Sequence, residues 1–527
     1  MAAVKKKMDF IHVLGNVGLI LHVPGIMAVI SIIVCLVFQE YYSIIPFTVT
    51  ALISFGIGQL LYQTCERHIQ PTLWDSMAIA ALSWLVCPLV SAIPCFWISY
   101  HRLQLGLQLE SAQALIHPIN ALFEAMSGFT STGLTLVRKP SEFSHALIWW
   151  RSFMQWVGGV GLIVFILSVT QASKNRYHLY YAEARSEVIG KTIQDTTRAI
   201  WGVYLLYTFC AIFLFIIAGM PIWEAINNGM TAIATGGFTS TDNSFAGYSI
   251  PIKLASVLIM FTGMVSFVVH VEIVKRGKFK DLWSSIPHRF IIFMFILGGV
   301  ALALIDRYTF YEWAWVDSLF MWASAMSTTG FSVGNLAQHA PTLKIFLIFA
   351  MLVGGSAGST SGGLKVQRFL NLVSGMTVRI RSIFEEKSTK NLKKYFSKKD
   401  KNGEEPELIV ADPEQVRKLF AAGVLFFLWI ITLFTAWMFI TYHLPHYKAF
   451  DAFFEVVSAM SNVGLTTDIV NPSLNPICLS LFIALMWLGR VEIIPAIVLI
   501  ISFIKVFRKT KKRRRKKQNE STTTDAN

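Results

Sequence analysis

Long apolar segments alternate with shorter polar segments along the whole chain. The apolar segments cover roughly residues 11–37, 44–64, 75–99, 145–170, 199–219, 252–274, 289–309, 342–375, 419–442 and 477–504. An apolar run of about 20 residues crosses the hydrocarbon core of a bilayer as a helix. The pattern therefore predicts an all-α integral membrane protein with ten transmembrane segments.

Composition supports a membrane protein. The chain has 527 residues, of which 54% are hydrophobic and 15% charged, and its mean hydropathy is +0.54. A soluble protein has about a quarter of its residues charged. The six cysteines lie in or beside apolar segments and form no C-x-x-C pair, so neither a disulfide framework nor a zinc site is expected.

The formal net charge of +15 raises the question of nucleic-acid binding. Most of the lysines and arginines fall in alternate loops, however, which is the distribution that orients membrane proteins with basic loops inside. We therefore expect both termini in the cytoplasm and no nucleic-acid partner. The opening MAAVKKK lacks a small-residue cleavage pattern and indicates a retained signal-anchor. The basic tail, KTKKRRRKKQNE, is either a topology anchor or a contact with anionic membrane lipid.

Four segments of the chain are copies of one pattern: FEAMSGFTSTGLT, NGMTAIATGGFTS, WASAMSTTGFSVG and VVSAMSNVGLTTD. Aligned without gaps they share a glycine, followed each time by Leu or Phe and preceded six positions earlier by Ser or Thr. These glycines are Gly133, Gly237, Gly330 and Gly464. A second glycine follows each one at nearly constant spacing, at Gly158, Gly263, Gly354 and Gly489. Chance would not place two landmarks in register four times, so the segments are repeats.

Each repeat consists of a span, a short amphipathic helix, the glycine segment and a second span. A helix of about 12 residues is about 18 Å long, which is roughly half a bilayer. It is therefore expected to enter the membrane from outside and stop near the middle, as a re-entrant pore helix does. The predicted units are two extra helices (1–74), repeats 1 to 3 (75–175, 176–280 and 281–385), a cytoplasmic linker with repeat 4 (386–505) and the basic tail (506–527).

The four glycine segments are predicted to form an ion filter. Non-helical backbone at membrane depth must be buried in protein or line water, and four loops around one axis meet that condition. Their carbonyl oxygens can replace the hydration shell of a monovalent cation, and glycine permits backbone conformations closed to other residues. The predicted filter residues are Ser131, Thr132, Gly133, Thr235, Gly236, Gly237, Thr328, Thr329, Gly330, Asn462, Val463 and Gly464.

Two features qualify the filter prediction. A glycine can simply terminate a helix, but that explains one copy and not four with matched flanks. The residue before the filter glycine differs among the repeats (Thr132, Gly236, Thr329 and Val463), so the four-fold symmetry is only approximate and fewer equivalent ion sites are expected than in a true tetramer.

The second span of repeat 3 contains VGGSAGSTSGGLK, which cannot hold a helix at about 1 kcal/mol for each glycine. The equivalent places in the other repeats, WVGGVG, FTGMVS and WLGRVE, contain fewer helix breakers. The segment is either a packing kink or a gate under the filter. The gate residues would be Gly354, Gly355, Gly358, Gly362 and Gly363, with Lys365 at the cytoplasmic end.

Two arginines lie inside apolar spans, where charge is costly and usually functional. Arg490 directly follows the second glycine of repeat 4, and it could supply a positive barrier or hold carbonyls of the gate loop. Arg151 is expected to form a salt bridge with Glu124 or Glu455, which occupy equivalent positions on their pore helices.

These motifs together resemble the Trk/Ktr/HKT superfamily of cation transporters, from about residue 75 to residue 505. The two extra N-terminal spans resemble the TrkH/TrkG type. The resemblance implies a potassium-translocating subunit, usually a homodimer with one pore per protomer, regulated by a cytoplasmic nucleotide-binding subunit of the TrkA (RCK) kind. It also implies that the Gly354–Gly363 loop is the gate and that Arg490 lies beside it. Plant relatives that favour sodium resemble this scheme with serine at the first filter glycine; Gly133 therefore favours potassium.

The expected function is potassium uptake across the bacterial inner membrane, with K⁺ as the transported ion and no organic cofactor. No motif in the sequence indicates whether potassium transport is coupled to protons or sodium, as in a symporter. The charged loop 376–417 is either a docking site for the regulator or a solvated charge run. The alternatives are a sodium-permeable member of the same superfamily and a secondary symporter with inverted repeats and broken helices. A membrane enzyme is not expected, because no catalytic motif occurs.

Overall fold

The computed structural model describes residues 10–65, 72–106, 109–162, 193–277, 280–309, 314–377, 380 and 413–505. Helices and their connecting loops make up all of these residues. The fold is thus all-α, as the apolar pattern predicts. The N-terminal lysines, the basic tail and most of the 376–417 loop lie outside the described residues.

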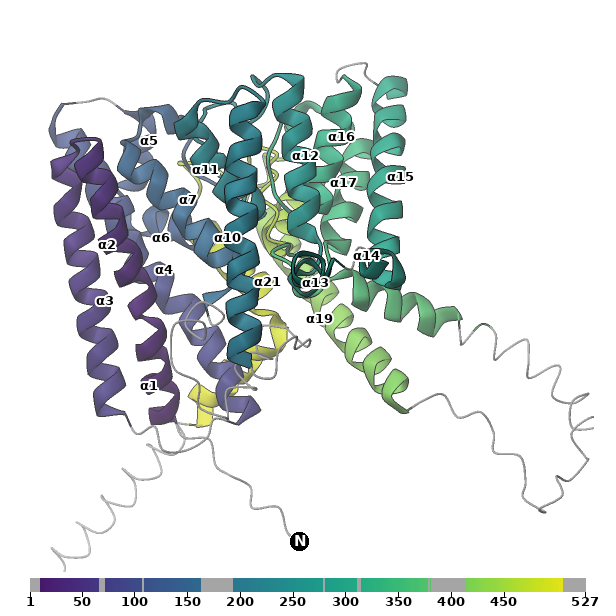
Figure 1. Ribbon diagram of the computed structural model, residues 1–527, viewed down its shortest axis with the longest axis horizontal. Helices are drawn as coiled ribbons and strands as arrows, with labels where there is room; N and C mark the ends of the chain where they lie inside the picture. The colour runs from purple at the N-terminus through teal and green to yellow at the C-terminus, as the bar shows by residue number, and fades with distance from the viewer. Residues whose placement is uncertain are drawn as a thin grey trace, which may run out of the picture.

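The first helices form a separate layer beside the repeats. α1 (Phe10–Ile20) and α2 (His22–Val37) together make one apolar stretch of 28 residues, and α3 (Ile44–Thr64) returns alongside them. Figure 1 shows these helices, in purple, at one side of the molecule. They pack against α4 (Leu73–Gln104) and α7 (His145–Val160), so the two extra spans lie on repeat 1.

The four repeats have the predicted order of elements. Their first spans are α4, α10 (Ile193–Ile217), α15 (Ile286–Thr309) and α19 (Pro413–His443). Their pore helices all have 12 residues, and are α6 (Pro118–Phe129), α11 (Ile222–Ile233), α16 (Trp315–Met326) and α20 (Ala449–Met460). Their second spans begin with α7, α12 (Ile250–Met264), α17 (Pro341–Val353) and α21 (Pro476–Val491). Short helices elsewhere are α5 (Glu110–Leu115), α13 (Phe267–Arg276) and α14 (Lys280–Ser284).

Local sequence signals fix where several of these helices begin. Thr72 and Asp75 form a capping box at the start of α4, because each side chain accepts a hydrogen bond from the other residue's backbone N–H. The Ser144 hydroxyl caps α7 and the Asn475 amide oxygen caps α21. Proline occupies the first turn of α6, α12, α17 and α21, where its missing N–H costs nothing.

The repeats close into a ring through one recurring contact. Each pore helix packs against the second span of the preceding repeat: α11 on α7, α16 on α12, α20 on α17, and α6 on α21. The last pair joins repeat 4 back to repeat 1. The pore helices therefore surround one axis in the same sense, which an inverted two-fold arrangement would not give.

Among the described residues, eight of the ten predicted spans are long and apolar enough to cross a membrane. Six of these eight spans are single helical stretches. The other two are pairs of helices with a sharp bend between them, each pair counted as one span. The remaining two are the second spans of repeats 1 and 3. In repeat 1, α7 covers 16 residues before the description stops at residue 162. In repeat 3, α17 is followed by the glycine-rich loop and a helix over 366–377.

The second spans break in every repeat, whereas the sequence indicated an interruption in repeat 3. α12 and α13 meet at an angle of 101°, and α21 meets Ile493–Lys505 at 111°. α7 ends at Val160 and is followed by Gly161, whose φ is 98°. The bend after α21 lies at Glu492, with a φ of 68°. One or two residues in extended conformation or with positive φ are enough for the bends in repeats 2 and 4, so no run of glycines is needed there.

A candidate ion filter and gate

The four glycine segments have the same backbone conformation. In each one a non-glycine residue takes the left-handed conformation two positions before the filter glycine: Ser131 (φ 52°), Thr235 (49°), Thr328 (58°) and Asn462 (53°). The filter glycines follow with φ between 84° and 92°. A left-handed residue with a Cβ is uncommon and costly. Its occurrence at one register position in all four repeats shows that the loops have one shape.

Hydrogen bonds at the ends of the pore helices explain this shape. The N–H of the residue before the filter glycine donates to the carbonyl five positions earlier, with distances of 3.0 Å for Thr132 to Ser127, 2.8 Å for Gly236 to Thr231, 2.9 Å for Thr329 to Ser324 and 2.9 Å for Val463 to Ser458. The left-handed residue donates three positions back, for example Ser131 to Gly128 at 3.0 Å. This pair of bonds is the Schellman motif. The pore helices are therefore terminated by Ser131 and its equivalents, and the filter glycines are not the terminators.

The filter glycines instead stand where neighbouring loops meet. A Cβ on each one would collide with the carbonyl oxygen of the residue before the glycine in the next loop. The colliding pairs are Gly133 with Gly236, Gly237 with Thr329, Gly330 with Val463, and Gly464 with Thr132. The four contacts close a ring in which carbonyl oxygens and glycine α-carbons alternate. Both the positive φ and the close approach require glycine.

The second glycine of each repeat allows its span to cross tightly behind the loops. A Cβ on Gly158 would collide with the carbonyl of Phe129, one on Gly489 with that of Met460, and one on Gly263 with Thr235. In repeat 3 the neighbour of Gly354 is Gly362 of the glycine-rich loop. The constant spacing of the two landmarks thus reflects one packing contact, which the glycine-rich loop replaces in repeat 3.

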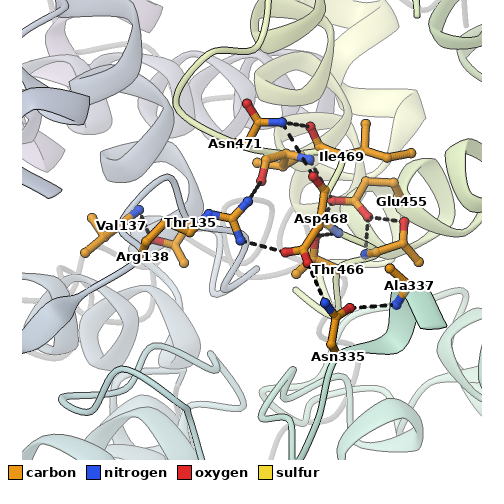
Figure 2. A network of polar contacts seen from close by, with 12 residues as sticks. Thr135, Val137, Arg138, Asn335, Ala337, Glu455, Thr466, Asp468, Ile469 and Asn471 are labelled. Atoms are coloured by element: carbon orange, nitrogen blue, oxygen red, sulfur yellow. Dashed lines mark hydrogen bonds and ion pairs between the residues drawn. The ribbon is translucent and has the colours of Figure 1, made fainter. Parts of the chain in front are cut away.

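All four filter glycines border one open vestibule. This cavity has a volume of about 370 Å³ and is also bordered by Thr135, Thr239, Ser332 and Thr466, the hydroxyl residues two positions after each glycine. Its rim joins three repeats: Arg138 Nη1 lies 2.6 Å from Asp468 Oδ1, and Asn335 Nδ2 donates to Asp468 Oδ2 at 2.9 Å (Figure 2). Ser141 also donates to Asp242 at 2.7 Å, joining repeats 1 and 2.

Two buried carboxylates stabilise the loops from behind. Glu124 pairs with Arg151 at 2.8 Å, both side chains being at most 2% exposed, so the expected ion pair of Arg151 forms with Glu124 and not with Glu455. Glu455 accepts from the hydroxyl of Thr466 at 2.6 Å and from the N–H of Thr467 at 2.8 Å (Figure 2). Thr135 makes the equivalent bond to Glu124 at 2.9 Å. The carboxylates therefore hold the outer halves of loops 1 and 4 rather than forming a ring of charge.

The glycine-rich loop lies against the ends of three pore helices. Gly362 N–H donates to Thr328 Oγ1 at 2.6 Å and Gly363 N–H to the Ser461 carbonyl at 3.0 Å. Thr360 Oγ1 donates to the carbonyl of Ile233 at 3.0 Å. These contacts connect the loop to repeats 2, 3 and 4 directly behind their filter segments.

Arg490 joins the same loop to repeat 1. Its guanidinium donates to the Thr360 carbonyl at 3.2 Å and to the Gly159 carbonyl at 3.0 Å, and it also contacts the Gly158 carbonyl. A small cavity on this side of the filter is bordered by Gly358, Gly362, Gly363, Lys365, Asn462 and Arg490. Lys365 has a φ of 72°, and its ammonium contacts the Ser361 carbonyl. Among the gate residues expected from the sequence, Gly354 and Gly355 do not border this cavity. Gly354 lies against Gly362, and Gly355 lies against Met264 of α12.

Two ion pairs between repeats, one half-buried and one buried, did not enter the sequence interpretation. Lys253 lies 2.7 Å from Asp317 and Lys344 lies 2.6 Å from Asp451. Both lysines stand ten positions before a second glycine, and both aspartates stand thirteen positions before a filter glycine. This double recurrence was the available signal. The pairs join repeats 2 and 3, and repeats 3 and 4.

The fold defines a multi-pass membrane protein built from four pseudo-symmetric repeats, and comparison with known proteins identifies its family. The family model described as "TrkH: Cation transport protein" matches residues 46–505. The chain belongs to this family.

Three known proteins are similar over most of the chain. An uncharacterized cation transporter, MJ1485 of Methanocaldococcus jannaschii, is 32% identical, with 96% of this chain and 98% of the relative covered. The Trk system potassium uptake protein TrkG of Escherichia coli is 28% identical, with 88% and 93% covered. The crystal structure of the potassium transporter TrkH from Vibrio parahaemolyticus superposes with a TM-score of 0.77 at 23% identity, covering 93% of this chain and 98% of that one.

Proposed function

We propose that this protein takes up potassium ions across the cell membrane through a filter of backbone carbonyl oxygens. The observation on which the proposal mainly depends is the ring in which each filter glycine abuts the carbonyl oxygen of the next loop. Relatives named as Trk potassium uptake proteins, at 26–28% identity, support potassium as the ion.

The filter would act by exchanging water for peptide oxygens. A hydrated ion enters the vestibule, where the hydroxyls of Thr135 and Thr466 lie close to the filter glycines. Carbonyls of Ser131, Thr132 and their equivalents then replace its hydration shell. Peptide oxygens suit a monovalent cation that sheds water readily, whereas divalent ions are held by carboxylates or keep their water.

We further propose that the Gly354–Gly363 loop is the gate. It adjoins the filter through Thr328 and Ser461, so an ion leaving the filter meets it next. Arg490 would have both roles considered for it, because it holds the Thr360 carbonyl and also places a positive charge on the inner cavity. Opening would require the loop to release Ile233 and Gly263, which Thr360 joins at 3.0 and 2.9 Å.

The assembly we propose is a homodimer in which each protomer has its own pore, bound by a cytoplasmic nucleotide-binding regulator of the TrkA kind. The relatives are named as members of a Trk system, which supports additional subunits. Basic loops favour cytoplasmic termini, which places the vestibule outside the cell and the glycine-rich loop toward the cytoplasm.

The direct test is rubidium uptake in cells that lack their own potassium uptake systems. Expression of the chain should restore growth at low potassium and produce Rb⁺ uptake that excess K⁺ suppresses far more strongly than excess Na⁺. Equal suppression by Na⁺ would favour the sodium-permeable alternative. Absence of Rb⁺ uptake by a correctly inserted protein would contradict the proposal.

A further inference from the structure

The second filter loop lacks a side chain that the other three have. The residue before the filter glycine is Thr132, Thr329 or Val463 in loops 1, 3 and 4, but Gly236 in loop 2. Gly236 is not among the residues with positive φ, so its backbone would accept any side chain. Backbone conformation therefore does not explain this glycine.

The space beside Gly236 is filled by the amide of Gln155, from α7 of repeat 1. Gln155 Nε2 donates to the Gly236 carbonyl at 2.5 Å, and Gln155 Oε1 accepts from the N–H of Phe238 at 3.0 Å. The Phe238 N–H requires an acceptor, which fixes the orientation of the amide. A Cβ on Gly236 would collide with this amide, whose residue is fully buried.

We call the contact between the second span of one repeat and the filter loop of the next a seam. Gln155 departs from the repeat pattern at the same seam as Gly236. The residue three positions before the second glycine is Met260, Met351 or Met486 in the other repeats. The register is confirmed by the backbone, because Ser131 Oγ donates to the Gln155 carbonyl at 3.2 Å and Asn462 Nδ2 donates to the Met486 carbonyl at 2.8 Å. Three seams thus pair methionine with a β-branched residue, and one pairs glutamine with glycine.

The bonded carbonyl belongs to the proposed filter. The Gly236 oxygen is the one that abuts Gly133 in the ring of four contacts. A buried carbonyl that accepts a hydrogen bond from a fixed amide is held in one orientation. Arg151 lies four residues before Gln155 on the same face of α7, and its guanidinium lies 4.2 Å from the centre of the Phe238 ring. One face of α7 thus contacts loop 2 at both Gly236 and Phe238.

We propose that Gln155 is a positioning residue of the filter and determines its selectivity. By holding the Gly236 carbonyl and the Phe238 N–H, Gln155 prevents loop 2 from contracting around Na⁺, which is smaller than K⁺. This inference depends on the proposed function, since it assigns a role within the filter.

The test compares Q155M, G236T and the double variant by Rb⁺ and Na⁺ uptake at matched surface expression. Q155M should lower the Rb⁺ to Na⁺ uptake ratio several-fold. G236T alone should lose most uptake, because the threonine collides with the amide. The double variant gives loop 2 the threonine–methionine pairing of loops 1 and 3, and should regain uptake and selectivity relative to G236T.

The matched control is M260L, at the equivalent position in repeat 2. This variant should leave the Rb⁺ to Na⁺ uptake ratio within about two-fold of the wild type, because the swap conserves volume.

Failure of this inference is distinguishable from failure of the proposed function. If the wild-type chain takes up Rb⁺ but Q155M keeps its ratio, or G236T transports normally beside Gln155, the role of Gln155 is wrong and the filter stands. If Q155M does not reach the membrane, the double variant is the deciding test. Rb⁺ uptake by the double variant that is no higher than uptake by G236T overturns the inference. No Rb⁺ uptake by the wild type contradicts the filter itself.

Discussion

At the residue scale, two independent constraints act on each filter glycine. The positive φ excludes most side chains, and the carbonyl oxygen of the next loop occupies the place of a Cβ. The recurrence of these glycines is visible in the sequence, and so is their need for an unusual conformation. Their contact with one another across the seams becomes visible only once the loops are placed around the axis.

Substitution of a filter glycine should therefore reduce selectivity. In G133S or G464S the new side chain forces the neighbouring carbonyl of Gly236 or Thr132 away from its position. We expect the ratio of Rb⁺ to Na⁺ uptake to fall several-fold at matched expression. The control is G247S, since Gly247 has open space around it and no positive φ. A ratio in G133S equal to that of G247S would count against a filter at this place.

Gln155 illustrates what residue-level reading of the sequence misses. The alignment shows that Gly236 breaks the pattern, and that four-fold symmetry is only approximate. It does not show that Gln155 compensates, because the two residues lie 81 positions apart and belong to different repeats. Such pairing depends on tertiary register, which hydropathy does not encode.

At the element scale, the pore helices follow closely from the sequence. The sequence predicts both their length of about 12 residues and the hydroxyl-rich segment at which they end. The bends in the second spans of repeats 2 and 4 are not, since Val265, Ser266 and Glu492 lie in apolar surroundings that read as continuous spans. A change at one or two dihedral pairs leaves no periodic signal.

The ion pairs between repeats should stabilise the ring. Lys344 is 3% exposed, and K344M would leave Asp451 buried without its lysine, a loss of about 3–5 kcal/mol by analogy with other broken buried pairs. We expect a clearly lower unfolding temperature for the purified protein in detergent. The exposed pair of Lys139 with Glu110 provides the control, because K139M should change that temperature little. Equal unfolding temperatures for K344M and K139M would show that the pair contributes nothing to the ring.

At the scale of the whole molecule, the ring and the glycine-rich loop form one closed unit. The pore helix of each repeat contacts the preceding repeat. The loop touches repeats 2, 3 and 4 directly, and Arg490 connects it to repeat 1. Same-direction repeats and their number were predictable from spacing. The ring contacts, and the placement of the two extra helices on repeat 1, required the three-dimensional structure (Figure 1).

Removal of most of the loop should open the pore. Deleting residues 356–361 eliminates the hydrogen bonds of Thr360 to Ile233 and Gly263. The deletion keeps Gly362 and Thr328, which are hydrogen-bonded to each other in the structure. We expect basal Rb⁺ uptake to rise several-fold with little change in the Rb⁺ to Na⁺ ratio, since the filter segments are untouched. Basal uptake no higher than that of the wild type would reduce the loop to a packing kink.

In the proposed filter, four glycine loops present peptide oxygens to one dehydrated alkali ion. The most direct measurement is an anomalous difference map of the purified protein crystallised with Rb⁺ in place of K⁺. We expect a peak on the axis between the four loops, within coordinating distance of carbonyls of Thr132, Gly236, Thr329 and Val463. A map with no peak between the loops, at a resolution and occupancy that reveal Rb⁺ elsewhere, would contradict it.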